Sequence, residues 1–448
     1  MKSWDAVVAG AGPSGCLVAD RLRARGHSVL LVDAGPRLRD GERVRDPDRR
    51  MWAFETAGGL SFDWYRVRAV GGRTLLWGGW SHRFPDATLR RAGFPYGVEA
   101  LAPVYDELER DLGVVQGTLD ARYERAARAL DVSIVPKRAP LDARGRIWTA
   151  ARTKSGRRAR THAAVVGLEH AARRATSARF VDLRDGATKR VRARAFVLAA
   201  SPIETARILL ESELGRGARG IGRNLADHMV ASYVLLEPAP PPPEAGRGPF
   251  PGSALVESFV NDGCSAPRRY RGGFSIELAG PVPLETLGIE RMVGSDELDR
   301  WGATLIHAIG ETFPHLRRFV DLDRDTRDLL ERPVPRVHLA WSREDRRMAA
   351  EMKQACIGLA DELGIPGSRL VPFVDPLLPG AGHEAGTVAM GADHESPCDA
   401  WGGLRALDNV WVADASALPT PGDRHPTLTI LAHATRAADA TARFLAGA

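Results

Sequence analysis

The sequence predicts an α/β protein in which one domain is assembled from separated chain segments and a second, α+β domain is inserted between them. Three observations support this organisation. The chain has 448 residues, which is more than one ordinary domain holds. A strand–turn–helix–strand pattern opens it, and further motif-rich segments lie in the middle and near the C-terminus. Residues 250–375 carry mixed strand and helix patterns without a readable motif.

The opening unit consists of two buried strands joined by a glycine-rich turn and a helix. The apolar runs at 4–9 and 28–33 predict the strands. The turn at 10–15 precedes a helical pattern, and Gly26 lies just past it, as a helix stop does. The order of these elements predicts a β-α-β unit with parallel strands.

Three glycines in the turn indicate that the unit binds a dinucleotide. Gly10, Gly12 and Gly15 match G-x-G-x-x-G, which allows a tight turn, close approach of a pyrophosphate to a helix N-terminus and close packing of helix on strand. Asp33 follows 23 residues after Gly10, where a ribose-binding acid is expected. A carboxylate there accepts from a 2′-hydroxyl and repels a 2′-phosphate. The unit therefore predicts FAD or NAD and argues against NADP.

The rest of the chain contributes further elements in order. An amphipathic helix is expected at 99–112, and residues 179–199 predict a hairpin around Asp185–Gly186 followed by a buried strand. A helix begins after Pro202. The proline run at 238–243 predicts a stiff linker or exposed loop, and the chain ends in a helix from 427 onward.

A second glycine-rich segment, at 70–84, contains VGGRTLLWGG. One interpretation is a loop whose backbone lies against a flat cofactor ring, where side chains would clash. The alternative is a flexible surface turn. Leu75, Leu76 and Trp77 are too apolar for a solvated turn, so the first interpretation is favoured.

Two histidines and one aspartate near the C-terminus are candidate functional residues. His383 opens HEAGTVAMG, and His425 is followed by Pro426, a good first helical residue. The other ten histidines are expected to be structural. Asp414 ends the apolar strand NVWVAD, where it can accept from a ribityl hydroxyl or act as a strand-end turn residue. The pattern favours neither interpretation.

Composition and charge exclude several classes of protein. Hydrophobic residues make up 44% and charged residues 26%, as in a soluble globular protein, and no apolar run reaches the roughly 18 residues of a membrane span. The short N-terminal apolar run predicts a strand and not a secretory signal, hence a cytoplasmic location. The net charge of +6 comes from basic residues interspersed with acidic ones, which argues against nucleic-acid binding. Neither a metal site nor a disulfide framework is expected from the four scattered cysteines, Cys16, Cys264, Cys356 and Cys398.

In this order, the motifs resemble those of the glucose–methanol–choline (GMC) family of FAD-dependent oxidoreductases. The resemblance is carried by GAGPSG with LLVDAG (30–35), VGGRTLLWGG (70–79), VLAASPIETARILLES (197–212), GIGRNLADH (220–228), HEAGTVAMG and LDNVWVADASALPTPGDRHPTLTI. It implies a Rossmann-like FAD-binding domain made from separated segments and a substrate domain built on an antiparallel sheet. The implied division is FAD-binding domain at 1–98, 160–228 and 380–448, connecting segment at 99–159, and substrate domain at 229–379.

The resemblance also implies roles for individual residues. His383 aligns with the family's active-site base or hydrogen-bonding partner of a substrate hydroxyl, and His425 with the second catalytic position, which is Asn or His in the family. The helix after His425 points its N-terminus to the flavin edge that becomes negative on reduction. His228, in the N-x-x-D-H motif, is expected to be structural at the domain junction. The implied cofactor-binding residues are Gly10, Gly12, Pro13, Ser14, Gly15, Asp33, Ala34, Gly72, Arg73, Thr74, Trp77, Gly78, Gly79, Val165, Ala200, Asp414, Ala415, His425, Pro426 and Thr427.

The WGGWSHRF form is closest to the pyranose-oxidase and gluconate-dehydrogenase branch of the family. Some members of that branch attach FAD through a histidine directly before the tryptophan. Leu76 occupies that place here, which predicts non-covalent FAD.

The implied activity is oxidation of a CH–OH group of an alcohol or sugar-like substrate, with hydride transfer to flavin N5 and a histidine as base. Oxygen, a quinone or a protein is the expected electron acceptor, and the sequence does not select among them. Three alternatives stay open: a redox-neutral lyase on the same scaffold, an NAD-dependent Rossmann enzyme and a non-catalytic flavoprotein.

Overall fold

The structure is a computed structural model, and it describes residues 3–39, 42, 53–57, 64, 66–214, 220–241, 249–250, 252–259, 269–290, 293, 300–374 and 382–447. Cys264 and the last two residues of the proline run at 238–243 lie outside these ranges. The other three cysteines are free and buried. No cluster of metal-ligating side chains occurs in the described part of the chain.

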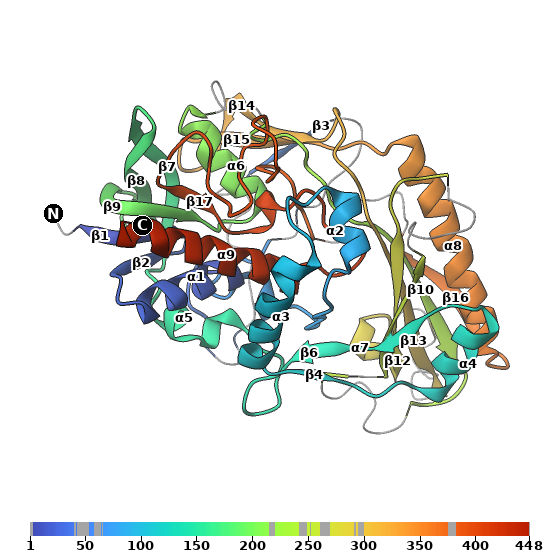
Figure 1. The fold of residues 1–448 in the computed structure, drawn as a ribbon. Coiled ribbons are helices and arrows are strands. Elements are labelled where there is room, and N and C mark those ends of the chain that lie inside the picture. The colour runs from blue at the N-terminus through green and yellow to red at the C-terminus, as the bar shows by residue number, and fades with distance from the viewer. Residues whose placement is uncertain are drawn as a thin grey trace.

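A parallel sheet forms the centre of one half of the molecule, the half drawn at the left of Figure 1. Strand β1 (Trp4–Ala9) lies between β2 (Val29–Val32) and β9 (Thr188–Leu198), and β17 (Val410–Val412) pairs with β9 on the other side. All three pairings are parallel. Segments from near the two ends of the chain therefore join one sheet, as the sequence predicts.

Helices cover both faces of this sheet because its strands are apolar on both sides. The side chains of β1 alternate: Ala6 and Val8 pack with α1 (Pro13–Ala24) and α9 (Thr427–Ala446), while Val7 and Ala9 face the other core. That second core contains residues of α3 (Val98–Leu112) and α6 (Pro202–Glu211). The predicted helices at 99–112, after Pro202 and at the C-terminus are confirmed.

The predicted hairpin is present and extends the sheet as an antiparallel meander of β7 (Ala163–Ala171), β8 (Arg174–Asp182) and the first half of β9. The turn contains Asp185 and Gly186, whose N–H donates to the Asp182 carbonyl at 2.8 Å. Gly186 has a φ of +71°, a conformation that favours glycine.

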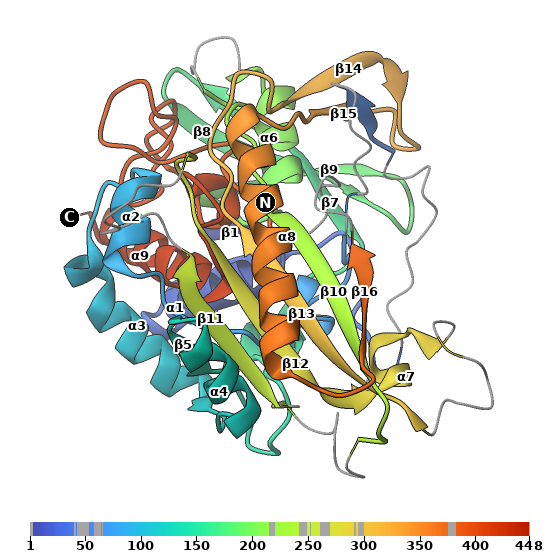
Figure 2. The same ribbon diagram turned by 90° about the vertical axis from the view of Figure 1, so that its right-hand side faces the viewer.

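An antiparallel sheet of six strands forms the second half, as expected for the inserted domain. Its order is β16 (Arg369–Val374), β10 (Met229–Glu237), β13 (Gly302–Gly310), β12 (Phe274–Pro283), β11 (Ser253–Phe259) and β5 (Ile134–Pro136). Helix α8 (Arg343–Leu363) crosses this sheet in Figure 2. Its Met348, Met352 and Cys356 pack in the same core as Tyr233 and Ile306.

Smaller elements connect the two halves. A three-stranded sheet has the order β14 (Phe319–Arg327), β15 (Pro333–His338) and β3 (Glu55–Ala57). The others are α2 (Asp86–Ala92), β4 (Val114–Gln116), α4 (Ala121–Ala129), β6 (Arg138–Pro140), α5 (Lys154–Arg158) and α7 (Leu284–Leu287). No described helix is both long and apolar enough to cross a membrane. The predicted α/β class with an inserted antiparallel domain is confirmed.

Candidate active site

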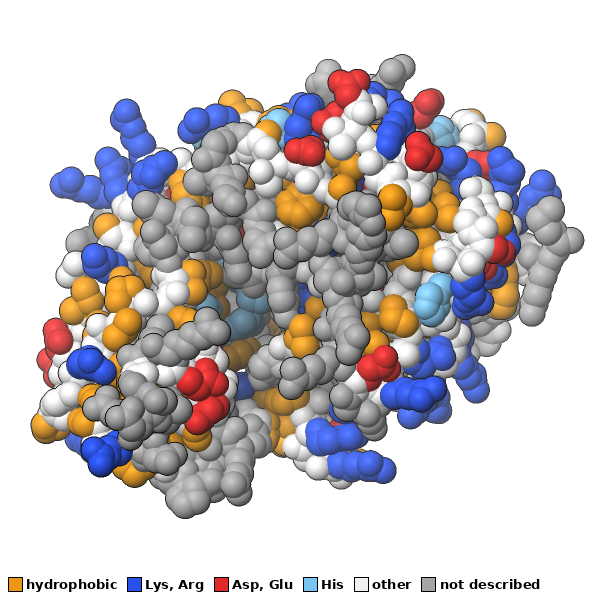
Figure 3. Space-filling model, turned by 180° about the vertical axis from the view of Figure 1, so that it is seen from behind, with side chains coloured by type: hydrophobic (Ala, Val, Ile, Leu, Met, Phe, Trp, Pro, Cys, Tyr) orange, Lys and Arg blue, Asp and Glu red, His pale blue; other side chains and the backbone are white. Residues whose placement is uncertain are grey.

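One cavity of about 520 Å³ runs from the glycine-rich turn of the parallel sheet to the antiparallel sheet. This volume is typical of a small-molecule or cofactor site. Every residue predicted to bind the cofactor lines it except Gly15, and both His383 and His425 line it too. Val165 is among them, at the start of the β7 strand. Figure 3 shows a hollow on one face of the molecule with histidine side chains within it.

The glycine-rich turn is shaped as the motif requires. A Cβ on Gly10 would lie 2.2 Å from the Ala199 carbonyl oxygen, and one on Gly15 would lie 1.9 Å from the Gly10 carbonyl oxygen. Glycine at position 10 therefore lets the turn pack closely against the Ala199 backbone, and glycine at position 15 lets helix α1 pack closely against the turn. A Cβ on Gly12 would meet no atom within 4 Å. Gly12 is also the N-cap of α1 and offers no capping side chain, so the first N–H groups of α1 lie beside the cavity.

Asp33 is tied to the same turn. Its Oδ2 accepts from the Ala11 N–H at 2.7 Å, and its Oδ1 accepts from the Gly35 N–H at 2.8 Å. Burial raises the pKa of Asp33, and these two backbone donors oppose that rise. Each carboxylate oxygen has a second lone pair, so the side chain can still accept from a ligand in the cavity.

The second glycine-rich segment is a wall of the cavity and not a surface turn. A short 3₁₀ helix at Gly72–Leu75 begins next to the first turn, where a Cβ on Gly72 would lie 3.2 Å from the Gly12 Cα. Trp77 donates from its indole N–H to the Trp148 carbonyl at 2.8 Å. Leu76 lines the cavity and is 52% exposed.

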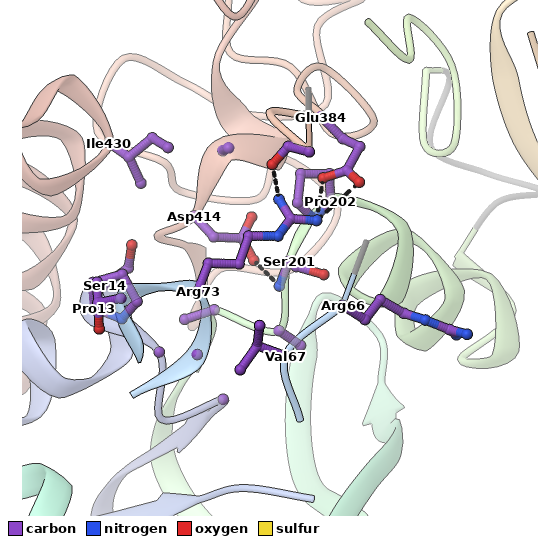
Figure 4. Close-up of a pocket in the computed structure, with 18 of the residues that line it drawn as sticks. Pro13, Ser14, Arg66, Val67, Arg73, Ser201, Pro202, Glu384, Asp414 and Ile430 are labelled. Carbon is purple, nitrogen blue, oxygen red and sulfur yellow. Dashed lines mark hydrogen bonds and ion pairs between the residues drawn. The ribbon is translucent and has the colours of Figure 1, made fainter. Parts of the chain in front are cut away.

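Arg73 connects this wall to the histidine motif. Its guanidinium donates to Glu384 Oε1 at 2.8 Å and to the Gly382 carbonyl, and the first of these contacts is drawn in Figure 4. Glu384 is buried. Burial, with the nearby Glu384 charge, raises the pKa of the buried Asp227 to about 7. The two buried acids and the partly exposed Arg73 thus form one cluster of charged side chains beside His383.

Asp414 behaves as a strand-end turn residue. Its Oδ2 accepts from the Ser201 N–H at 2.9 Å and from Thr205 Oγ1 at 2.7 Å, and Figure 4 shows the first bond. Its Oδ1 accepts from the Ser416 N–H at 2.9 Å and from the Ser416 hydroxyl. Four protein donors match the roughly four acceptor sites of a carboxylate. Of the two interpretations left open by the sequence, the structure favours the turn residue.

The two C-terminal histidines meet. His383 Nε2 lies 3.0 Å from His425 Nδ1, and the rings are nearly perpendicular with centroids 4.6 Å apart. Burial, then the neighbouring His425 and His228, hold the pKa of His383 well below its usual value. His383 is therefore neutral near pH 7. His425 precedes the N-terminus of α9, which has no acidic residue in its first turn and lines the cavity with Pro426 and Thr427.

His228 is placed differently from the structural role expected for it. Its Nδ1 lies 2.9 Å from His383 Nδ1, so it contacts the predicted active-site histidine directly. Its Nε2 lies 2.9 Å from the Gly422 carbonyl. The side chain is fully buried. The expectation that His228 only holds a domain junction is therefore incomplete.

A row of residues across the antiparallel sheet closes the other end of the cavity. Val374, Ser232, His307 and Glu277 are successive partners on β16, β10, β13 and β12. Paired positions share a face of the sheet, so the row points to one side. Val374 and His307 line the cavity, and His307 Nδ1 lies 2.6 Å from Ser232 Oγ.

Glu277 completes the histidine cluster. Its Oε1 lies 2.5 Å from His425 Nε2, and neither atom has another hydrogen-bonding partner in the described part of the chain. The indole of Trp80 stacks on His425 at a centroid distance of 5.9 Å and an angle of 13°. Two deprotonated atoms at 2.5 Å repel each other, so the His425–Glu277 pair holds a proton between them.

Glu277, His307, Trp80 and Glu384 were not predicted to belong to the site. Glu277 and His307 lie in the motif-poor region, and only sheet register brings them to the histidines. Glu384 directly follows His383, and Trp80 directly follows VGGRTLLWGG within the second glycine-rich segment. Their places beside motif residues were a signal that sequence reasoning passed over.

The described residues fit FAD at this site. Gly12 leaves open space at a helix N-terminus, Asp33 retains acceptor capacity, and a second uncapped helix N-terminus lies beside the histidines. A nucleotide cradle and a histidine pair share one cavity, and this combination fits a flavin-dependent oxidoreductase.

Comparison with known proteins agrees. Residues 141–230 and 314–434 match two family models described as GMC oxidoreductase, and residues 8–111 match one described as an NAD(P)-binding Rossmann-like domain. The chain belongs to the GMC oxidoreductase family, as the motifs suggest.

Among curated relatives, the chain is 28% identical to paromamine 6′-oxidase of Streptomyces fradiae, over 98% of this chain and 92% of the relative. It is 25% identical to 2-methyl-1,2-propanediol dehydrogenase of Mycolicibacterium austroafricanum, over 98% and 95% of the two chains. Among solved structures, pyridoxine 4-oxidase from Mesorbium loti superposes with a TM-score of 0.74 at 22% identity, covering 98% of this chain and 99% of that one. This last likeness shows the fold alone.

Proposed function

We propose that the protein oxidises a CH–OH group of a small alcohol or sugar-like substrate, using FAD held in the cavity. The observation that carries the proposal is the His383–His425 pair, 3.0 Å apart, in the same cavity as the nucleotide cradle. The two curated relatives named above are an oxidase and a dehydrogenase, which supports an oxidation rather than a lyase reaction.

We assign the adenine dinucleotide end of FAD to the first glycine turn and to Asp33, with Val165 on the adenine side. The isoalloxazine end belongs beside the second glycine segment and the N-terminus of α9. When bound, the flavin supplies the acceptor for the hydride of the C–H bond. The positive end of the α9 dipole favours negative charge at that place.

In this proposal His383 takes the hydroxyl proton. The imidazole starts neutral because burial and its histidine neighbours depress its pKa, so one of its two ring nitrogens carries a lone pair that can take a proton. His383 Nε2 and His425 Nδ1 are 3.0 Å apart, so the substrate hydroxyl must replace their direct contact; its oxygen then accepts from His425 while its proton goes to His383. The His307 and Val374 side chains line the substrate end and belong to the surface that sets specificity.

Three finer points belong to the same proposal. FAD is non-covalent, since Leu76 cannot form a covalent link to the ring. Residues 229–379 form the substrate domain, with the flanking boundaries given above. The cytoplasm is the proposed location. Oxygen, a quinone and a protein are the candidate electron acceptors.

The test is anaerobic mixing of the purified yellow enzyme with a panel of primary alcohols, secondary alcohols and sugars. Bleaching of the oxidised flavin bands by one class supports the proposal, and return of the bands on admitting air identifies an oxidase. A flavoprotein whose bands survive every alcohol while a lyase substrate is turned over would overturn it. His383→Ala, still holding FAD, is the matched control that should not bleach on the same timescale.

A further inference from the structure

The N-x-x-D-H motif supplies a buried histidine that the proposed function does not use. His228 has no exposed surface, and both of its ring nitrogens have partners: Nε2 with the Gly422 carbonyl and Nδ1 with His383 Nδ1, each at 2.9 Å. The His228 and His383 rings meet edge to face, with centroids 5.0 Å apart at 81°. Such a contact either fills space or fixes the proton positions of the partner ring.

The Gly422 carbonyl fixes the protonation of His228. A carbonyl oxygen only accepts hydrogen bonds, so the proton of His228 must lie on Nε2. Burial lowers the pKa of His228 to about 3, so the ring is neutral and carries one proton only. Its Nδ1 therefore presents a lone pair to His383.

The contact with His228 in turn fixes the position of the proton on His383. Because His228 Nδ1 is an acceptor, His383 Nδ1 must be the donor in the 2.9 Å contact. His383 is also neutral, so its single proton is then used, and its Nε2 is a lone pair. This Nε2 is the atom that faces His425 Nδ1 at 3.0 Å. His425 Nδ1 is in turn the donor, and its Nε2 faces Glu277.

We propose that His228 is a positioning residue that fixes the tautomer of His383, so that the unprotonated Nε2 of His383 faces the substrate. The inference rests on the proposed function for its effect on turnover, but not for the tautomer itself. Without an acceptor at Nδ1, a neutral imidazole is free to move its proton to Nε2. In that tautomer His383 presents a donor to the hydroxyl and cannot take its proton.

The backbone around the two rings supports this role. The N–H groups of His228 and His383 both donate to Asp227 Oδ1, at 2.8 and 3.0 Å. Thr312 Oγ1 donates to the Asp227 carbonyl at 2.6 Å. One carboxylate oxygen thus ties together two histidines that lie 155 positions apart in the sequence. The adjacent Asp and His of the motif therefore have separate roles, since Asp227 holds the backbone of both histidines and His228 orients the His383 ring.

The test is a pair of variants at position 228 in the FAD-loaded enzyme. His228→Asn places a side-chain oxygen near the position of Nδ1 and keeps an acceptor for His383. His228→Leu fills similar space without an acceptor. The first readout is the ¹⁵N NMR spectrum of enzyme labelled at the histidine rings, in which an N–H nitrogen and a lone-pair nitrogen have distinct shifts. The His383 signals are assigned by their loss in His383→Ala.

The expected spectrum of the unaltered enzyme has the His383 proton on Nδ1. His228→Asn should retain it, while His228→Leu should lose it or show both tautomers. Flavin reduction by a responsive alcohol should then slow by about 10²- to 10⁴-fold in His228→Leu, the usual size of a general-base contribution, with KM nearly unchanged. His228→Asn should restore most of that rate.

A His383 proton found on Nε2 in the unaltered enzyme would overturn the inference without any variant. So would a His228→Leu enzyme with unchanged ¹⁵N shifts and an unchanged rate. Should His228→Leu fail to fold, the spectrum of the unaltered enzyme still decides. If the enzyme shows the expected His383 tautomer but none of the tested alcohols reduces its flavin, the proposed function is contradicted and the tautomer assignment still stands.

Discussion

Two glycines of the first turn lie three residues apart, and replacing each by alanine should affect a different property: the stability of the fold at position 15 and the affinity for FAD at position 12. A Cβ at position 15 would lie 1.9 Å from the Gly10 carbonyl oxygen, so Gly15→Ala must displace backbone. Overpacking of this kind costs about 1–3 kcal/mol or more in the free energy of unfolding. Gly15→Ala should therefore lower the melting temperature of the apo-protein.

Gly12→Ala should leave the apo-protein nearly as stable as before. Gly12 has a φ of −71°, and its added Cβ meets no atom within 4 Å. Alanine is a poorer N-cap than glycine by several tenths of a kcal/mol to about 1 kcal/mol, and the reduced freedom of the unfolded chain offsets this by about 0.4–1 kcal/mol. The new methyl group instead enters the cavity where we place the pyrophosphate.

The expected loss at position 12 is in FAD affinity. A charge-assisted hydrogen bond contributes about 1.5–3 kcal/mol, so losing one backbone contact to the pyrophosphate weakens binding by about ten- to a hundredfold. FAD titration of the apo-protein by flavin fluorescence gives Kd, and thermal unfolding without FAD gives stability. An unchanged Kd for Gly12→Ala, with an unchanged melting temperature, would refute the placement of the cofactor on this turn.

Three other perturbations each test a single feature of the molecule. Trichloroacetic acid should release the yellow colour into the supernatant, because Leu76 stands where a linking histidine would be; flavin held in the pellet would contradict this. Glu277→Gln keeps a hydrogen-bonding oxygen beside His425 Nε2 but removes the charge. Because charged hydrogen bonds contribute about 1.5–3 kcal/mol, this variant should reduce its flavin about ten- to a hundredfold more slowly while FAD stays bound. An unchanged rate in stopped flow would exclude Glu277 from the mechanism. Burial raises the pKa of Glu311 to about 7 from 4.5, so the folded protein retains a proton that the unfolded chain releases in this interval, and the stability contributed by Glu311 falls as pH rises through it. Between these two pH values, the melting temperature of the unaltered protein should accordingly fall more steeply with pH than that of Glu311→Gln. Melting temperatures that change in parallel for the two proteins would contradict this prediction.

Local motifs explain what the sequence predicted well. The β1–α1–β2 unit depends on glycines that permit close backbone contacts within one short stretch, so Gly10 and Gly15, together with the order of strand, helix and strand, indicate the fold. The C-terminal segment was equally readable, because His383 and His425 stand beside helix-start and turn residues. Their 3.0 Å contact brings together the two positions that the resemblance assigns to catalysis.

The substrate end of the site was not readable for a physical reason. Glu277 and His307 reach the histidines through the pairing of β12 with β13, and such a pairing joins residues with no common local pattern. His228 was visible in its motif, but its role depends on the Gly422 carbonyl and on His383, which lie far along the chain. Asp414 shows the opposite case: the family resemblance implied a cofactor contact, whereas the four donors to its carboxylate all belong to the protein.

The central claim is that His383 is the proton acceptor, and one stopped-flow measurement tests it most directly. The rate of anaerobic flavin reduction is measured for His383→Ala and for His425→Asn, each with FAD bound. His383→Ala should be slower than the unaltered enzyme by about a hundred- to ten-thousandfold, while His425→Asn keeps a hydrogen-bonding side chain and should lose little. The two barriers should differ by about 3 kcal/mol or more, at about 1.36 kcal/mol per tenfold change in rate. Equal and small losses in the two variants would show that neither histidine is the base.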